Sequence, residues 1–133
     1  MGSLICGIHH VALKCDGTAE FEKTLHFYQD VLGLVPVRSW GEGENAGAML
    51  STGDGLLEIF ASGRKLPQGA IRHFALRTER VDDCVAAVRA AGYPITVEPK
   101  DIVIASNPPF PARIAFCTGP VGEEIEFFQE RAL

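Results

Sequence analysis

Ile8-His9-His10-Val11-Ala12-Leu13-Lys14 is repeated 63 positions later as Ile71-Arg72-His73-Phe74-Ala75-Leu76-Arg77. A second stretch, Leu57-Glu58-Ile59-Phe60, is repeated 68 positions later as Ile125-Glu126-Phe127-Phe128. In each half, a helix-like segment lies between the stretch with the histidine and the stretch with the glutamate. An internal repeat of this kind indicates two copies of one structural unit. The repeat therefore places one histidine and one glutamate at matched positions in each half.

Both halves predict the same order of elements. In the first half, alternating apolar residues predict a strand at 7–14, and apolar residues at helical spacing predict a helix from Thr18 to Leu32 that Gly33 ends. Further strands are predicted in the first half at about 35–40, 46–52 and 55–61. The second half repeats this order, with a strand at about 70–77, a helix at 81–91, and strands at 94–98, 112–118 and 123–129.

The connections complete this organisation. Residues 62–69 form a linker, and the stretch 100–111, which holds three prolines, is predicted to be irregular. We predict an α+β fold in a single domain of two paired βαβββ modules, at about 1–64 and 65–133. Neither half is large enough to bury much apolar surface alone, so the modules should close on each other or on a second chain.

Composition limits the possible functions. The chain has 133 residues, 47% of them hydrophobic and 22% charged, which suits one globular domain. The sequence contains neither an apolar run of about 18 residues nor a signal peptide, so we expect a cytoplasmic protein with no membrane span. A net charge of −5 without a Lys/Arg-rich stretch disfavours nucleic acid as a partner. The four cysteines fit no metal-binding or C-x-x-C spacing and are predicted to be buried, reduced thiols.

Strand alternation predicts where the repeated polar residues point. His10 opposes Val11 and Leu13, and Glu58 opposes its apolar neighbours, so both should lie on the face away from the helix. The same reasoning applies to His73 and Glu126. His9 is a competing ligand, but alternation and the match to His73 favour His10. His26, on the first helix, has no counterpart in the repeat and is interpreted as a surface or helix-packing residue.

Two imidazoles and two carboxylates suggest a metal centre with open water positions. Such a donor set suits six-coordinate Ni²⁺, Co²⁺, Mn²⁺ or Fe²⁺, or an expanded Zn²⁺, whereas structural zinc is usually tetrahedral and rich in sulfur. Four further residues on the same predicted face indicate what kind of small-molecule substrate could bind there. Lys14 and Arg77, four residues after each histidine, would hold an anionic group, and Phe60 and Phe128 would give apolar walls; either pair could also be ordinary surface or packing residues.

These motifs resemble the vicinal oxygen chelate superfamily, the glyoxalase, bleomycin-resistance and dioxygenase group. The resemblance covers nearly the whole chain and includes the segment Leu25-His26-Phe27-Tyr28-Gln29-Asp30-Val31-Leu32-Gly33-Leu34. It implies that the modules curl into a cup around a divalent metal held by His10, Glu58, His73 and Glu126. Homodimers often close this cup, so a homodimer is expected.

The retained ligand set is most similar to that of glyoxalase I-like proteins, the lactoylglutathione lyases. The resemblance implies a lyase or isomerase that acts on a 2-oxoaldehyde–thiol adduct by proton transfer through an enediolate. It implies Glu126 as the catalytic base and Glu58 as its counterpart, with nickel, zinc or cobalt as the metal and iron or manganese as further candidates. The alternatives are an epimerase or an extradiol-type dioxygenase on this scaffold, or a non-catalytic protein that binds a small molecule such as an antibiotic.

Overall fold

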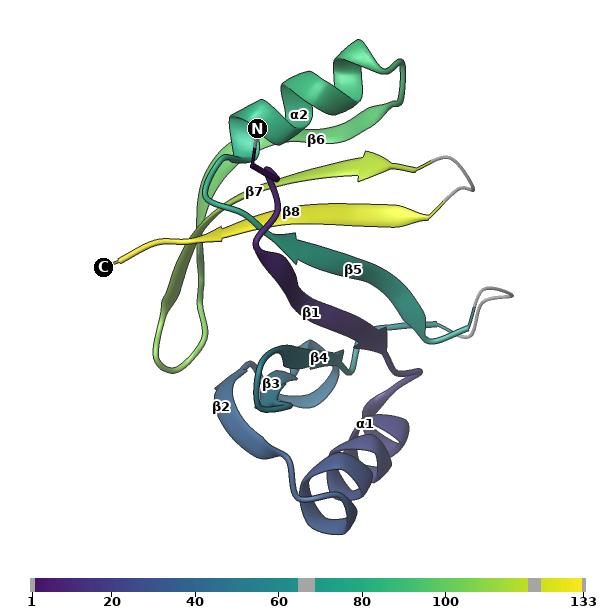
Figure 1. The fold of residues 1–133 in the computed structure, drawn as a ribbon. Coiled ribbons are helices and arrows are strands. Elements are labelled where there is room, and N and C mark those ends of the chain that lie inside the picture. Colours follow the sequence, from purple (N-terminus) through teal and green to yellow (C-terminus); the bar gives the residue numbers. More distant parts are fainter. Residues whose placement is uncertain (1, 65–68, 120–122, 133) are drawn as a thin grey trace. The chain divides into compact units, whose positions relative to one another are not determined.

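Two compact units make up the chain, and each contains one helix packed on its own four strands (Figure 1). The computed structural model describes residues 2–64, 69–119 and 123–132. The unit that we call the α1 unit comprises residues 10–72 and 105–108, and the α2 unit comprises residues 1–9, 73–104 and 109–133. Among the described residues, no helix has the length and apolar composition needed to cross a bilayer.

The α1 unit contains a mixed sheet with strands in the order β2-β3-β4-β1. β1 runs parallel to β4, and the other neighbouring strands are antiparallel. A parallel pair needs a long crossover connection, and the helix and two intervening strands supply it. The elements are β1 (Gly7–Lys14), β2 (Val35–Trp40), the 3₁₀ turn η2 (Gly43–Asn45), β3 (Gly47–Ser51) and β4 (Leu56–Phe60).

The first helix has the predicted extent but changes its form. α1 (Thr18–Leu25) continues directly into η1 (His26–Val31), which is π-helical. The N–H of Leu32 donates to the carbonyl of Phe27, five residues earlier, at 3.0 Å. A turn closed by i→i+5 hydrogen bonds holds more residues than an α-helical turn, so the side chains that follow are rotated about the axis. Tyr28 still packs against the core, but Leu32, which continues the apolar spacing of the helix, is 56% exposed. Gly33, with φ +80°, then allows the chain to leave the helix.

The core of the α1 unit lies between α1 and the sheet. Val11 and Leu13 of β1 pack against this core, as does Tyr28 of η1. The buried residues of the cluster are Cys15, Phe21, Ala48, Leu50, Leu57, Ile59 and Ala61. The predicted alternation of β1 and β4 is therefore confirmed in this unit, and His10 and Glu58 lie on the opposite face of the sheet.

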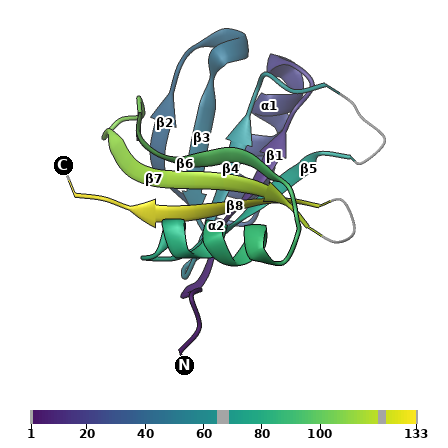
Figure 2. The same cartoon turned by 90° about the horizontal axis from the view of Figure 1, so that it is seen from above.

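The α2 unit repeats this arrangement with strands in the order β5-β8-β7-β6. β5 runs parallel to β8, and the other neighbouring strands are antiparallel. The elements are β5 (Ile71–Arg77), α2 (Val81–Ala90), β6 (Ile95–Ile104), β7 (Phe110–Thr118) and β8 (Glu124–Glu130). α2 lies along the strands of its sheet (Figure 2) and buries Val81, Cys84 and Val85 against β7 and β8. Leu4 and Ile5, which precede β1, also pack on this core.

The prediction that residues 100–111 are irregular is wrong for 100–104 and 110–111, which belong to strands, and is confirmed for 105–109, which connect them. β6 (Ile95–Ile104) and β7 (Phe110–Thr118) extend into this stretch and form one long antiparallel hairpin. β6 is the last strand in the order of the α2 unit and pairs with a neighbour, β7, on one side only. Polar residues such as Lys100 are common on such edge strands. Pro108 and Pro109 lie between the two strands, where no N–H is needed for the ladder.

The predicted α+β fold class is confirmed, because both units follow the order βαβββ and the strands of each unit pair in both parallel and antiparallel fashion. The module limits of about 1–64 and 65–133 stay a prediction. Residues 65–68 of the predicted linker and residues 120–122 before β8 lie outside the described residues.

All four cysteines lie in the described part of the chain and are free thiols, but they differ in exposure. Cys15, Cys84 and Cys117 are buried, as predicted, whereas Cys6 is exposed because it lies in the segment that precedes β1. Burial raises the pKa of each of the three buried thiols. The folded state therefore favours their protonated form. The stability that this gives is fully present below the ordinary thiol pKa, about 8.5, and is lost as the pH rises through the raised values.

We predict that a soluble disulfide reagent labels Cys6 alone in the folded protein. The other three thiols should stay unlabelled near neutral pH, because burial excludes the reagent and keeps them protonated. Mass spectrometry of the labelled protein, before and after addition of denaturant, measures both groups. A Cys6→Ser variant serves as the control, and rapid labelling of that variant without denaturant would show that the assignment of buried thiols is wrong.

Candidate metal centre

The first His–Glu pair lies within the α1 unit. His10 Nε2 is 3.3 Å from Glu58 Oε1, and the two side chains are only 1% and 8% exposed. Parallel pairing of β1 with β4 sets this geometry, because Ala12 is the register partner of Glu58 and His10 is two residues from Ala12 on the same face. Ala12 is fully buried, and its small side chain leaves the imidazole room to reach the carboxylate.

The second pair lies within the α2 unit and has the same local design. His73 Nε2 is 3.2 Å from Glu126 Oε1, and the side chains are 10% and 7% exposed. Ala75, two residues after His73, is the register partner of Glu126 and is also fully buried. Phe116 of β7 places its ring edge-on to His73, with ring centroids 5.4 Å apart. The repeat in the sequence is therefore a repeat of three-dimensional side-chain geometry within each unit.

Each pair could bind a divalent cation. A nearly buried carboxylate is costly unless a cation or hydrogen-bond donors compensate its charge. In each unit, one imidazole nitrogen and one carboxylate oxygen lie close enough to coordinate a common ion. Nitrogen and oxygen donors of intermediate hardness suit first-row divalent metals and include no thiolate that would favour a structural zinc site.

The Nδ1 side of His73 has its own neighbour. Glu124 Oε1 lies 3.8 Å from His73 Nδ1, and this carboxylate is half exposed. A carboxylate on the second nitrogen of a ligating histidine fixes the orientation and tautomer of the ring. Glu124 lies two residues before Glu126 on β8, so both side chains share one face of the strand. The repeat did not select Glu124, because the equivalent position in the first half is Leu56.

The predicted substrate residues form matched cross-strand pairs. Lys14 is the register partner of Phe60, and its Nζ lies 5.4 Å from the centre of that ring. Arg77 is the register partner of Phe128, but its guanidinium donates to the carbonyl of Cys6 at 3.3 Å. In both units a cation therefore stands beside a phenylalanine. The role of all four predicted residues in binding stays a proposal.

His9 is buried in the α2 unit, in contacts that the sequence did not reveal. Its ring is 2% exposed, stacks on Phe128 with centroids 4.0 Å apart, and its Nε2 lies 2.9 Å from Glu130 Oε2. Phe110 packs on the same ring pair. His26, by contrast, is exposed and pairs with Asp30 one helical turn later, as expected for a surface histidine.

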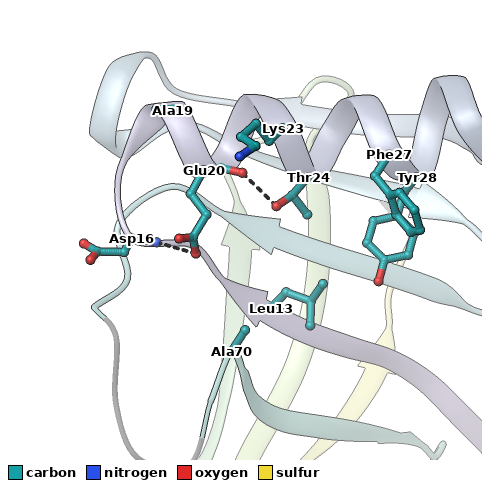
Figure 3. A pocket seen from close by; sticks show the side chains of 9 residues that line it. All are labelled: Leu13, Asp16, Ala19, Glu20, Lys23, Thr24, Phe27, Tyr28 and Ala70. Atoms are coloured by element: carbon teal, nitrogen blue, oxygen red, sulfur yellow. Dashed lines mark hydrogen bonds between the residues drawn. The ribbon is translucent and has the colours of Figure 1, made fainter.

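A cavity of about 670 Å³ lies in the α1 unit, lined by residues of α1 and η1, by the end of β1 and by Ala70, which directly precedes β5 (Figure 3). Leu13 lines this cavity, and Leu13 belongs to the helix-facing side of β1. The cavity is therefore on the other face of the sheet from His10 and Glu58. Polar groups at the rim of the cavity hydrogen-bond to one another. The Glu20 carboxylate accepts from the Asp16 N–H at 3.1 Å, and the Glu20 backbone carbonyl accepts from the Thr24 hydroxyl at 2.7 Å.

Comparison with known proteins places this geometry in context. Residues 7–127 match the family model of the Glyoxalase/Bleomycin resistance protein/Dioxygenase superfamily. Among curated proteins, no sequence matches the chain. The structure is similar to methylmalonyl-CoA epimerase from Mycobacterium tuberculosis, with 19% identity, a TM-score of 0.74, and coverage of 99% of this chain and 93% of the epimerase.

Two further structures show the same likeness. A methylmalonyl-CoA epimerase in complex with methylmalonyl-CoA and NH4+ has 22% identity and a TM-score of 0.72, with 98% of this chain and 97% of the epimerase covered. The Mn(II)-bound glyoxalase from Novosphingobium aromaticivorans has 25% identity and a TM-score of 0.70, with 99% of this chain but 43% of the glyoxalase covered. The family match spans nearly the whole sequence and the fold is shared. The chain belongs to the Glyoxalase/Bleomycin resistance protein/Dioxygenase superfamily.

Proposed function

We propose that this protein is a divalent-metal enzyme of the glyoxalase I type, a lyase or isomerase that moves a proton at a carbon beside a carbonyl group. The observation that carries the proposal is the repeated His–Glu pair, His10 with Glu58 and His73 with Glu126, at 3.3 and 3.2 Å. Two pairs of identical design on repeat-equivalent strands are hard to explain by packing alone. The similar structures include methylmalonyl-CoA epimerases and a glyoxalase, which supports catalysis.

We propose His10, Glu58, His73 and Glu126 as the ligands of one metal, completed within one chain or between the chains of a homodimer. The donor set fits nickel, zinc or cobalt, and iron or manganese are further candidates. The Mn(II)-bound glyoxalase among the similar structures supports a divalent ion without identifying it. A small, anionic molecule is the proposed substrate.

The bound metal would supply positive charge beside the carbonyl oxygen and so make the adjacent C–H more acidic. Glu126 is proposed to take that proton and return it, with Glu58 as its counterpart in the α1 unit. Both carboxylates are nearly buried and each lies beside a histidine, which would hold it in a fixed position for the proton transfer. Lys14 and Arg77 would hold the anionic end of the substrate, and Phe60 and Phe128 its apolar part.

A second candidate is an epimerase that acts on a 2-methyl acyl thioester. The epimerase structures match this chain over nearly the full length of both proteins, whereas the matched glyoxalase is more than twice as long as the matched region. Both reactions begin with removal of a proton beside a carbonyl, so one set of residues serves either. Assays with methylglyoxal plus a thiol, and deuterium exchange at C2 of methylmalonyl-CoA, separate the two.

The metal that co-purifies tests the remaining alternatives. Nickel, cobalt, zinc or manganese at one ion per site would favour proton transfer, and iron with oxygen consumption would favour a dioxygenase. A protein that binds no metal and turns over neither substrate class would instead support a non-catalytic binding protein.

Substitution of Glu126 tests its proposed role as the catalytic base. Glu126→Gln should keep the fold and some metal binding but lower turnover by about 10²-fold or more, because an amide cannot accept the proton. Steady-state rates on whichever substrate the wild type accepts provide the measurement. Glu79→Gln, an exposed carboxylate between β5 and α2, is the matched control and should keep wild-type rates. Unchanged turnover in Glu126→Gln would remove Glu126 as the base.

Substitution of His10 tests its proposed role as a metal ligand. His10→Ala should lower metal affinity, and activity should partly return at high metal concentration, because three of the four ligands remain. Metal content after dialysis, measured by mass spectrometry of the metal, checks this. His26→Ala removes an exposed histidine 68% open to solvent and should leave the metal content unchanged. Equal metal content in the two variants would contradict the ligand assignment.

A further inference from the structure

A row of side chains crosses the α1-unit sheet on the face that carries His10 and Glu58. Register pairs connect Lys14 to Phe60, Phe60 to Gly47, and Gly47 to Trp40. Directly paired residues share a face of the sheet. The row therefore begins at Lys14, a predicted substrate-binding residue, and ends at Trp40 on β2, the only tryptophan in the sequence.

Gly47 allows the tryptophan to lie across the row. A Cβ at this position would stand 2.2 Å from the Cε2 and Cζ2 atoms of Trp40, so the indole occupies the space of the missing side chain. The ring reaches Phe60, with centroids 5.6 Å apart and an interplanar angle of 61°. The indole thus lies over the backbone of Gly47. Trp40 remains half-buried rather than fully buried.

A β-bulge in β2 places this tryptophan and an arginine on the site face. The register shifts between Pro36 and Arg38, after which Arg38 pairs with Met49 and Trp40 pairs with Gly47. Without the extra residue, Val37 would oppose Met49, and simple alternation would turn Arg38 and Trp40 to the other face. Met49 in turn pairs with Glu58. The bulge therefore puts a cation and a large aromatic ring on the same face as the proposed catalytic carboxylate.

The chemistry of this surface defines a ligand class. A tryptophan face stacks on flat unsaturated rings, and an arginine two residues away on the same strand face binds carboxylate or phosphate oxygens in a fork. Neighbouring strands lie about 4.8 Å apart, so Arg38 stands about 10 Å across the sheet from Glu58. A group bound at Trp40 would therefore be a remote part of a substrate whose reacting carbon lies near His10 and Glu58.

We propose that Trp40, supported by Gly47, and Arg38 form a specificity subsite for a flat aromatic or unsaturated group that carries an anion. This inference rests on the proposed function for the position of the reacting end, but it is tested by binding alone. It adds two residues to the site that neither the repeat nor the helical and strand periodicity of the sequence selected.

Fluorescence of the single tryptophan tests the proposal with two probes of equal charge. Benzoate has a flat aromatic ring, and cyclohexanecarboxylate has a saturated ring of similar size. In the full-length protein as purified, benzoate should bind saturably, change Trp40 fluorescence and bind several-fold more tightly than cyclohexanecarboxylate. Isothermal titration calorimetry should give the same order of affinity.

Variants separate recognition from sheet packing. Trp40→Leu should abolish the preference for benzoate, and Trp40→Phe should retain part of it. Gly47→Ala should weaken benzoate binding while keeping the tryptophan, because the new Cβ displaces the indole. Arg38→Gln should weaken both carboxylates by about fivefold to tenfold, because a charge-assisted hydrogen bond is lost. Circular dichroism and thermal melting identify any variant that does not fold, and Trp40→Phe and Arg38→Gln still decide the result if the others fail.

Two outcomes would overturn the proposal. One is the absence of saturable benzoate binding to the folded wild-type protein. The other is an unchanged ratio of benzoate to cyclohexanecarboxylate affinity in folded Trp40→Leu or, if that variant does not fold, in Trp40→Phe. Because these measurements need no turnover, failure of the proposed enzyme activity would leave the binding result standing, and the reverse also holds.

Discussion

The parallel pairing of β1 with β4, and of β5 with β8, is the interaction on which both His–Glu pairs depend. In each pair of strands an alanine stands beside the glutamate, and the histidine lies two residues before that alanine. A shift of the register by one residue would turn every side chain of the strand to the opposite face. The apolar residues would then leave the helix, so burial of the core and formation of the His–Glu pair require the same register.

The helices enforce this register energetically. In the α1 unit, Leu57 and Ile59 pack beneath α1, and in the α2 unit Phe127 packs beneath α2. Burying an aliphatic or aromatic side chain of this size contributes about 1.5–3 kcal/mol. Several such residues on two strands outweigh the cost of holding one carboxylate away from water, which is how a sheet can present a desolvated acid on its other face.

The two units share the His–Glu pair but differ in the residues that surround it. The outer strands of both units have register shifts. In the α1 unit the shift in β2 brings Arg38 and Trp40 to the site face, whereas in the α2 unit Phe116 and Glu124 lie around His73. In the α2 unit, the position equivalent to Phe60 is Phe128, which is buried under His9. Internal repetition therefore preserves the pair that could hold a metal while the surrounding residues diverge.

The sequence alone determined the βαβββ order, the helix-covered faces and the identity of both His–Glu pairs, because period-two and helical patterns are local and the repeat confirmed each in a second copy. It could not locate β6 beyond its fourth residue, since polar residues on an outer strand and nearby prolines resemble a loop. The bulge before Arg38 was equally invisible, because it is defined by pairing with β3 and not by the composition of β2. The contacts of His9 with Glu130 and Phe128 join residues more than 100 positions apart, and only tertiary structure decides such contacts. Local periodicity fixes which face a residue occupies, but the neighbours on that face come from strand order and register.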